Sequence, residues 1–137
     1  MKAEYTSQEM NRLLRNAIQT PDGTILASRH RHDYREYEDD NGEVYIVDGG
    51  LDYLRRSINH NTPATDLSLT EVDPHLVVRE KVTWGTYGKL GDQPLSEITI
   101  ATMETEHLQA VIDTQYNMYP QIRDLMQVEL EYRNECT

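Results

Sequence analysis

The chain of 137 residues has little cysteine and no long apolar run. Its single cysteine, Cys136, cannot form an internal disulfide, and one thiol excludes a cysteine-rich zinc site. No segment approaches the ~18 apolar residues of a membrane span, and the N-terminal MKAEYTSQEM lacks the apolar core of a signal peptide. We therefore expect a single domain over residues 1–137 that works in a cytoplasm and contacts no membrane.

Positive charge is also scarce. The chain carries 24 acidic and 13 basic residues, a net charge of −11, and this charge disfavours DNA and RNA because their phosphates would be repelled. The distribution is uneven: residues 1–35 hold six basic and four acidic side chains, a net +2, so the remainder carries −13. The first third can therefore hold a small anion.

Phenylalanine is absent, and the aromatic groups are nine tyrosines and one tryptophan. A buried tyrosine needs a partner for its hydroxyl, and tyrosine-rich surfaces suit interfaces and flat ligands. Alternatively, tyrosine replaces phenylalanine at half-buried strand positions and has no role in binding.

Turn residues predict two hairpins in the first half of the chain. Pro-Asp-Gly at 21–23 divides a hairpin over 16–28, and Asn-Gly at 41–42 divides a second over 33–48. A capping box that begins at Thr6 predicts a short N-terminal helix that continues through Leu13 and Leu14.

Apolar spacing extends the prediction to the rest of the chain. Residues 51–58 show helical spacing, and 75–84 alternate like a strand, although Asp73-Pro74 also resembles a helix start. Ile98 and Ile100 indicate another strand. Two apolar stripes, at 108–116 and after Pro120 at 122–130, predict an antiparallel helix pair. The expected class is α+β: a small antiparallel sheet built from hairpins, with C-terminal helices packed on it.

The densest cluster of chemically active side chains is Ser-Arg-His-Arg-His-Asp-Tyr at 28–34. In an extended strand, its two arginines and Asp33 would share one face, and its two histidines and Tyr34 the other. Paired arginines can grip a pyrophosphate, whereas His-x-His needs a third ligand such as Asp48 or His60 to bind a metal. The segment also fits an edge strand protected by charge.

Two further segments carry chemistry. Asp-Gly-Gly at 48–50 leads into Arg55 and Arg56, and exposed N–H groups beside arginines can cradle phosphate. Trp84 and Tyr87 lie among glycines, which suits stacking on a purine. The alternatives are a tight turn with solvated arginines, and a tryptophan at the edge of the core.

Six blocks of sequence together resemble one bacteriophage protein family. The two longest are the blocks at 28–34 and Val-Asp-Gly-Gly-Leu-Asp-Tyr-Leu-Arg-Arg at 47–56. The others are Arg-Asn-Ala-Ile at 15–18, Trp-Gly-Thr-Tyr-Gly at 84–88, Gln-Pro-Leu at 93–95 and Glu-Thr-Glu-His-Leu at 104–108. Over roughly residues 15–115 the chain resembles the anti-Thoeris signal sponges of the first type.

This resemblance implies a phage protein that acts in the cytoplasm of the infected bacterial host. There a TIR-domain enzyme converts NAD into a cyclic ADP-ribose isomer that activates an immune effector. A sponge of this kind binds and sequesters the signal without degrading it and uses no cofactor. The family also implies a small sheet with helices, and a homodimer or larger homo-oligomer with ligand pockets between protomers.

Chemistry and motif position together select the residues that would hold such a ligand. The aromatic pair would stack on the base, the carboxylates would accept ribose hydroxyls, and the arginines would meet the pyrophosphate. The candidate ligand-binding residues are Arg29, Arg31, Asp33, Asp48, Arg55, Arg56, Arg79, Trp84 and Tyr87. We assign no catalytic residue and no metal ligand.

Two departures from the family pattern limit what carries over. Related proteins place cysteine pairs between the two long blocks, where this chain has the Asn-Gly hairpin, so a zinc role does not transfer. The last helices offer only Arg123 and Arg133 as cations, which disfavours a cyclic oligonucleotide there.

Two other classes of function stay open. His30, His32 and Asp33 could cooperate in acid–base catalysis, which would make the protein a small phosphodiesterase or nucleosidase. The acidic two-thirds of the chain would instead suit a protein-interaction inhibitor or a DNA mimic.

Overall fold

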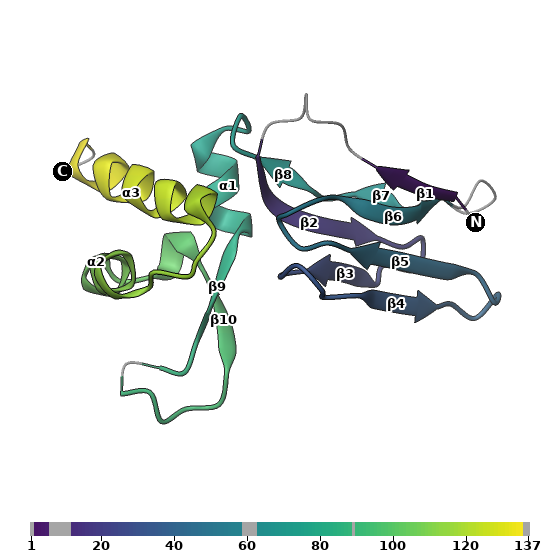
Figure 1. Ribbon diagram of the computed structural model, residues 1–137, viewed down its shortest axis with the longest axis horizontal. Coiled ribbons are helices and arrows are strands. Elements are labelled where there is room, and N and C mark those ends of the chain that lie inside the picture. Colours follow the sequence, from purple (N-terminus) through teal and green to yellow (C-terminus); the bar gives the residue numbers. More distant parts are fainter. Residues whose placement is uncertain (1, 6–11, 59–62, 89, 136–137) are drawn as a thin grey trace. The chain divides into compact units, whose positions relative to one another are not determined.

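The computed structural model describes residues 2–5, 12–58, 63–88 and 90–135. The chain divides into two compact units, Met1–Val72 and Asp73–Thr137, here the N-terminal and C-terminal units (Figure 1). Each unit has buried apolar side chains of its own. The two units are defined by the contacts within each part of the chain, and such contacts do not decide whether the two parts form one domain. The single domain over residues 1–137 therefore stays a prediction.

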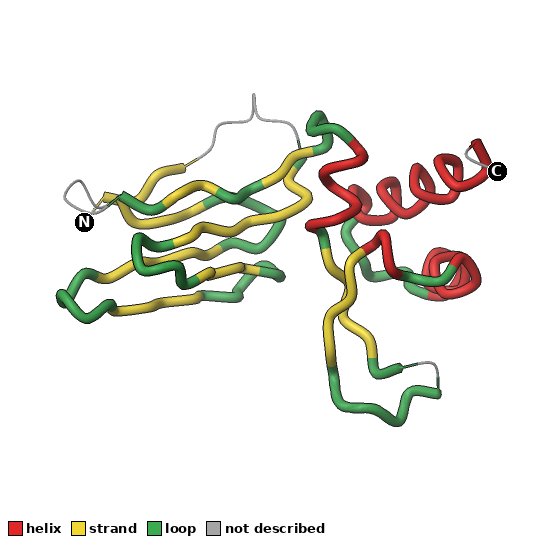
Figure 2. The backbone as a smooth tube through the Cα atoms, turned by 180° about the vertical axis from the view of Figure 1, so that it is seen from behind, coloured by secondary structure: helices red, strands yellow, loops and turns green. Residues whose placement is uncertain are grey.

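The N-terminal unit consists of antiparallel strands in two sheets (Figure 2). The first sheet has the order β1-β6-β5-β4, with β1 at Lys2–Tyr5, β6 at Arg55–Ile58, β5 at Val44–Asp48 and β4 at Arg35–Glu38. The second has the order β3-β2-β7, with β3 at Ile25–Ser28, β2 at Leu13–Gln19 and β7 at Thr65–Asp66. Strand β8 at Leu69–Thr70 also pairs with β2.

Both predicted hairpins are present. Strands β2 and β3 pair from Asn16 opposite Ser28 to Gln19 opposite Ile25, and β4 pairs with β5 along all of its four residues. The turns between them place Gly23 at a φ of 94° and Gly42 at 80°, a backbone conformation that glycine adopts without strain. Local turn chemistry therefore set both registers.

The sheets of the N-terminal unit enclose a small apolar core. Strand β3 contacts both β4 and β5, so the second sheet lies against the first. The core comprises the buried residues Ile18, Tyr45 and Val47, with Leu26, Tyr37 and Ala64 packed against them. The Tyr45 hydroxyl donates to the Asp39 carboxylate at 3.2 Å, which supplies the partner that a buried tyrosine needs.

One helix predicted in this unit is wrong, and a second is wrong at its end. Leu13 and Leu14 lie in strand β2, while residues 6–11 of the predicted N-terminal helix lie outside the described residues. Residues 51–58 form a turn followed by β6, because Asp48 and Val47 pair with Arg55 and Arg56 across an antiparallel ladder. Pairing between strands outweighed helical spacing over these short segments.

The C-terminal unit contains three α-helices and a two-stranded hairpin within the described residues. Helix α1 spans His75–Lys81, and the hairpin joins β9 at Thr83–Thr86 to β10 at Ser96–Thr99. A 3-10 turn, η1, at Ile100–Thr102 leads to α2 at Thr105–Thr114, and α3 spans Pro120–Glu135. With the hairpin sheets, these helices make the chain α+β, as the sequence predicted.

Helices α2 and α3 run antiparallel, as predicted. Arg123 in the first turn of α3 donates to the Ile112 carbonyl near the end of α2, and Arg133 donates to Thr105 at its start. The expected start at Pro120 is also confirmed. Most of the two apolar stripes is buried, but Tyr116 lies beyond α2 and is exposed.

The strand predicted over 75–84 is wrong for its first seven residues. Helix α1 begins directly after Pro74, whose carbonyl accepts hydrogen bonds from the N–H groups of Val77 and Val78. Only Thr83 onward is a strand, and β10 ends at Thr99, so Ile100 belongs to η1.

No helix among the described residues has the length and apolar character to span a membrane.

Candidate functional site

The two longest sequence blocks meet in the N-terminal unit. The hydroxyl of Ser28 accepts a hydrogen bond from the Gly50 N–H at 2.8 Å and donates to the Asp33 carbonyl at 2.7 Å. The side-chain amide of Asn16 donates to the Asp48 and Gly50 carbonyls at 2.9 and 3.0 Å. These buried neutral groups join the turn at 28–34 to the turn at 48–53.

The glycines at 49 and 50 allow the two turns to approach so closely. Gly50 has a φ of +55°, and a Cβ on it would lie 2.3 Å from the carbonyl carbon of His30. Gly49 has a φ of +100°, and a Cβ there would lie 2.2 Å from the Tyr53 carbonyl oxygen. The turn at 48–53 therefore requires glycine on both conformational and steric grounds.

The block at 28–34 is a turn, so the extended conformation that would give its side chains alternating faces is not adopted. The N–H of Asp33 donates to the His30 carbonyl at 2.9 Å, so the alternating faces of arginine and histidine do not form. The Asp33 carboxylate points inward and accepts from the Arg29 N–H at 2.8 Å and from Arg35 at 2.7 Å. A fixed carboxylate closes this turn.

These contacts determine the charge state of Asp33. Burial alone would raise its pKa, but the hydrogen bonds from the Arg29 N–H and from Arg35 outweigh burial and hold the pKa below its ordinary value. His30 lies at the edge of this arrangement, with Nε2 4.0 Å from the Asp33 carboxylate. Asp33 is therefore charged at neutral pH and organises the turn.

Cations and a second carboxylate surround the junction of the two turns. Asp48 is buried and accepts from the Gly49 N–H at 2.8 Å, and its other oxygen lies 3.8 Å from Arg55. The Arg55 side chain is 58% exposed, and Arg29 and Arg31 are exposed in the neighbouring turn. The structure thus gathers five of the predicted residues into one region of the N-terminal unit.

Arg56 differs from these five because its side chain is buried. Its guanidinium donates to Ser68 at 2.8 Å, lies 2.9 Å from the Asp66 carboxylate and reaches the Asn16 amide oxygen at 3.4 Å. These contacts link β6 to the segment at 66–68. They argue against Arg56 as a ligand contact and assign it a structural role instead.

The predicted aromatic pair belongs to the C-terminal unit. Trp84 is half-buried in β9, opposite Ile98 of β10, and Tyr87 is exposed where β9 ends. The five clustered residues all belong to the N-terminal unit. The aromatic pair therefore belongs to a different unit from Arg29, Arg31 and Arg55.

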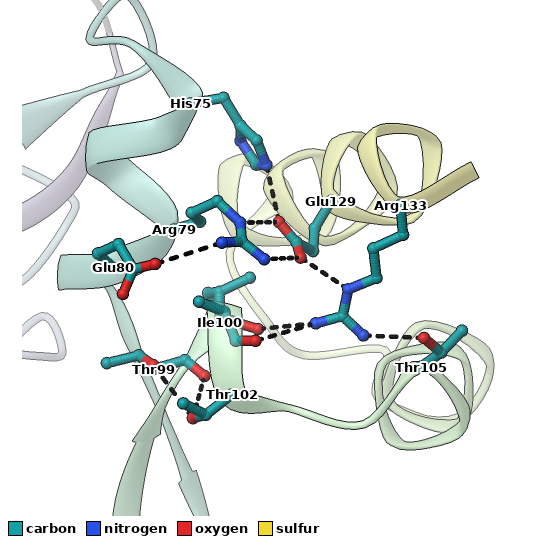
Figure 3. Close-up of polar contacts among 10 residues, drawn as sticks. His75, Arg79, Glu80, Thr99, Ile100, Thr102, Thr105, Glu129 and Arg133 are labelled. Atoms are coloured by element: carbon teal, nitrogen blue, oxygen red, sulfur yellow. Dashed lines mark hydrogen bonds and ion pairs between the residues drawn. The ribbon is translucent and has the colours of Figure 1, made fainter. Parts of the chain in front are cut away.

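Arg79 belongs to a buried carboxylate cluster in the C-terminal unit, made of Glu129, His75, Arg79 and Arg133 (Figure 3). Glu129 is fully buried on α3. Arg79 donates two hydrogen bonds of 2.8 Å to its carboxylate. Arg133 Nε and His75 Nε2 lie 2.7 and 2.8 Å from the same carboxylate oxygens. This engagement argues against Arg79 as a ligand contact.

The carboxylate cluster holds Glu129 in its charged form. Burial alone would raise its pKa, but hydrogen bonds from Arg79, Arg133 and His75 outweigh burial and lower the pKa to about 2. Arg133 also donates to the carbonyls of Ile100 and Ala101, and Arg79 lies 4.8 Å from the ring centre of Tyr132. The cluster therefore ties α1, η1 and α3 together.

The sequence analysis missed the residues that position these groups. Asn16 and Ser28 act through hydrogen bonds to residues 48 and 50, which are distant in the sequence. Arg35 pairs with Asp33 only two residues away. The carboxylate cluster did leave a signal, since both of its helices place members four residues apart, His75 with Arg79 and Glu129 with Arg133. Among the described residues, no group of three or more His, Cys, Asp or Glu side chains could hold a metal ion.

Comparisons with known proteins identified no family for this chain. A scan against protein-family models found no match, and neither the curated proteins nor the solved structures matched the chain. The resemblance to the anti-Thoeris signal sponges therefore stays a prediction.

Proposed function

We propose that the protein binds a cyclic ADP-ribose-type signal and sequesters it without degrading it, as a phage anti-defence protein in an infected bacterial cell. The observation that carries the proposal is the junction of the turns at 28–34 and 48–53, where exposed arginines surround two fixed carboxylates. The proposal includes a homodimer or larger homo-oligomer.

The junction offers groups that match the ligand. Arg31 and Arg55 are exposed and can donate forked hydrogen bonds to a pyrophosphate. Asp48 has one oxygen that accepts a backbone N–H, and its second oxygen, 3.8 Å from Arg55, can accept a ribose hydroxyl. Stacking of Trp84 or Tyr87 of the C-terminal unit on an adenine is a separate part of the proposal, which the Trp84 variant below tests by itself.

The same geometry disfavours an enzyme that uses His30, His32 and Asp33. A general acid or base must gain or lose a proton near neutral pH. Asp33 is instead held as an anion by Arg35 and the Arg29 N–H, with a lowered pKa. Both histidines are exposed on the turn. Sequestration therefore fits the junction better than catalysis does.

The test is a capture-and-release experiment. The protein is incubated with cyclic ADP-ribose isomers, separated from unbound ligand and then denatured, and the supernatant is analysed by mass spectrometry. Intact signal that appears only after denaturation supports the proposal. An altered product would support a phosphodiesterase or nucleosidase, and a lack of uptake would leave the acidic interaction inhibitor.

Two variants examine the assigned groups in the same experiment. Arg55→Ala and Trp84→Ala should each weaken capture about tenfold, because each removes one charge-assisted or stacking interaction. Lys81→Ala is the matched control, since it removes an exposed charge in helix α1 of the C-terminal unit. Unchanged affinity in both test variants would contradict the site assignment.

A further inference from the structure

Tyr34 is an exposed aromatic residue of the unit that holds the clustered arginines. It is 51% exposed, whereas Tyr45 is buried in the apolar core of the same unit and Tyr37 packs against that core. Tyr34 ends the sequence block at 28–34 and directly precedes strand β4. A large ring that is half-exposed offers its apolar face to a ligand. The N-terminal unit therefore has an aromatic candidate of its own.

Tyr34 shares one face of the first sheet with Asp48 and Arg55. In this sheet Glu36 lies opposite Ile46, and Asp48 lies opposite Arg55. Opposed residues share a face, and so do residues two apart on one strand, so Glu36, Asp48 and Arg55 lie on the same face. The Tyr34 hydroxyl donates to the Glu36 carboxylate at 3.4 Å, which puts the phenol on this face. The core residues of β5 alternate with these and lie on the other face.

The main chain on both sides of Tyr34 is held by hydrogen bonds. Before it, the Asp33 carbonyl accepts from the Ser28 hydroxyl at 2.7 Å, and the N–H of Tyr34 itself donates within the turn at 3.0 Å. After it, Arg35 pairs with Val47 in the ladder of β4 and β5. A ligand that stacks on the ring therefore meets a main chain that is already ordered, which lowers the entropic cost of binding.

The charged groups on this face act on the Tyr34 hydroxyl. Burial of part of the side chain raises the pKa of this hydroxyl, and so does Glu36. Arg55 lowers this pKa and Asp48 raises it, and the net shift is upward. The hydroxyl therefore keeps its proton at neutral pH, so the ring adds no negative charge that would repel a pyrophosphate. A neutral ring and an exposed arginine on one face can contact the base and the phosphates of one nucleotide.

We propose that Tyr34 stacks on the purine base of the bound nucleotide, on the same face as the Arg55 guanidinium that meets its pyrophosphate. This inference deepens the proposed function and rests on it for the identity of the ligand. Because every base has a face that stacks, Tyr34 selects nucleotides over phosphates that carry no base. A purine has two faces, so this contact does not depend on stacking by Trp84 or Tyr87.

The experiment measures affinity by calorimetry for three probes: cyclic ADP-ribose, adenosine monophosphate and inorganic pyrophosphate. Tyr34→Ala should weaken binding of the first two about tenfold, because one base–aromatic stack is lost. Pyrophosphate has no base, so its affinity should not change. Tyr34→Phe keeps the ring and should keep the affinity for all three probes. Tyr116→Ala is the matched control, since it removes an exposed tyrosine of the C-terminal unit.

Each outcome decides at least one of the two proposals. If the unmodified protein binds cyclic ADP-ribose and Tyr34→Ala binds it equally well, the stacking assignment is wrong and the proposed function stands. Equal losses in Tyr34→Ala and Tyr34→Phe would assign the contact to the hydroxyl and also overturn stacking.

Two outcomes overturn the proposed function. If adenosine monophosphate binds in a Tyr34-dependent way and the cyclic nucleotide does not bind, the stacking assignment stands and the proposed function is wrong. If neither adenine-bearing probe binds, both are wrong. Should Tyr34→Ala fail to fold, Tyr34→Leu carries the same test, because it removes the aromatic ring and keeps an apolar side chain.

Discussion

The N-terminal unit joins its turns through neutral buried groups, whereas the C-terminal unit joins its helices through a buried charge. In the first, Asn16 and Ser28 bridge backbone atoms of two turns. In the second, Glu129 gathers two arginines and a histidine. Both arrangements satisfy buried polar atoms, and they differ in which charges remain at the surface.

This difference separates a candidate binding region from a structural one. In the N-terminal unit, amide and hydroxyl groups join the two turns, and Arg31 and Arg55 stay exposed around the junction while Arg56 is buried against Asp66. The C-terminal unit directs Arg79 and Arg133 at Glu129, which removes them from contact with a ligand. An arginine therefore indicates an anion site only after its internal partners are known.

The largest expected effect comes from removing the buried charge. Glu129→Gln leaves the guanidinium groups of Arg79 and Arg133 facing a neutral amide, and it should lower the free energy of unfolding by about 4 kcal/mol. Urea unfolding measures the loss. Hydrogen exchange should increase in 75–81 and 120–135 while 44–48 stays protected.

Glu131→Gln serves as the control because it changes an exposed carboxylate on the same helix. It should change stability by less than about 0.5 kcal/mol. Equal stability of the two variants would show that the buried carboxylate contributes no more than a surface one.

Acid should weaken the C-terminal unit through the same residue. The pKa of Glu129 is lowered from 4.5 to about 2 in the folded chain. The charged carboxylate therefore contributes fully to the free energy of unfolding above about pH 4.5. This contribution, about 3 kcal/mol, is lost as the pH falls toward 2. Unfolding curves of the unmodified protein and of Glu129→Gln are recorded at successive pH values. Their difference isolates the contribution of the Glu129 carboxylate to the free energy of unfolding. Parallel pH profiles would contradict the assignment.

A smaller effect is expected from the neutral network. Asn16→Ala leaves the buried carbonyls of Asp48 and Gly50 without their side-chain donor and should cost about 2 kcal/mol. Hydrogen exchange should increase in the turns at 28–34 and 48–53. Gln19→Ala, on the same strand, removes only an exposed amide contact and should cost less than about 0.5 kcal/mol.

Sequence reasoning succeeded where the structure depends on local chemistry. Pro-Asp-Gly at 21–23 and Asn-Gly at 41–42 predicted both hairpins, because these residues favour the required turn conformations before any tertiary contact forms. Pro120 and the apolar stripes predicted the antiparallel helices α2 and α3 for similar reasons.

It failed where distant contacts decide the structure. Residues 55–58 became a strand because β5 and β1 offered ladder partners on both sides. Residues 75–81 became a helix despite their β-branched side chains, and Arg79 on that helix reaches Glu129, 50 residues away. For the site, the sequence indicated the two blocks and their arginines, but it could not show that Arg56 and Arg79 already have internal partners.

The close approach at Gly50 has a consequence for how this sequence can change. Gly23 and Gly42 have positive φ, so a side chain at either turn strains the backbone, but a Cβ on either would meet nothing within 4 Å. At Gly50 any side chain would meet the main chain of His30, which no exchange of neighbouring side chains can move aside. A substitution at Gly23 or Gly42 should therefore cost backbone strain alone, whereas one at Gly50 should also force the His30 main chain away from the turn at 48–53.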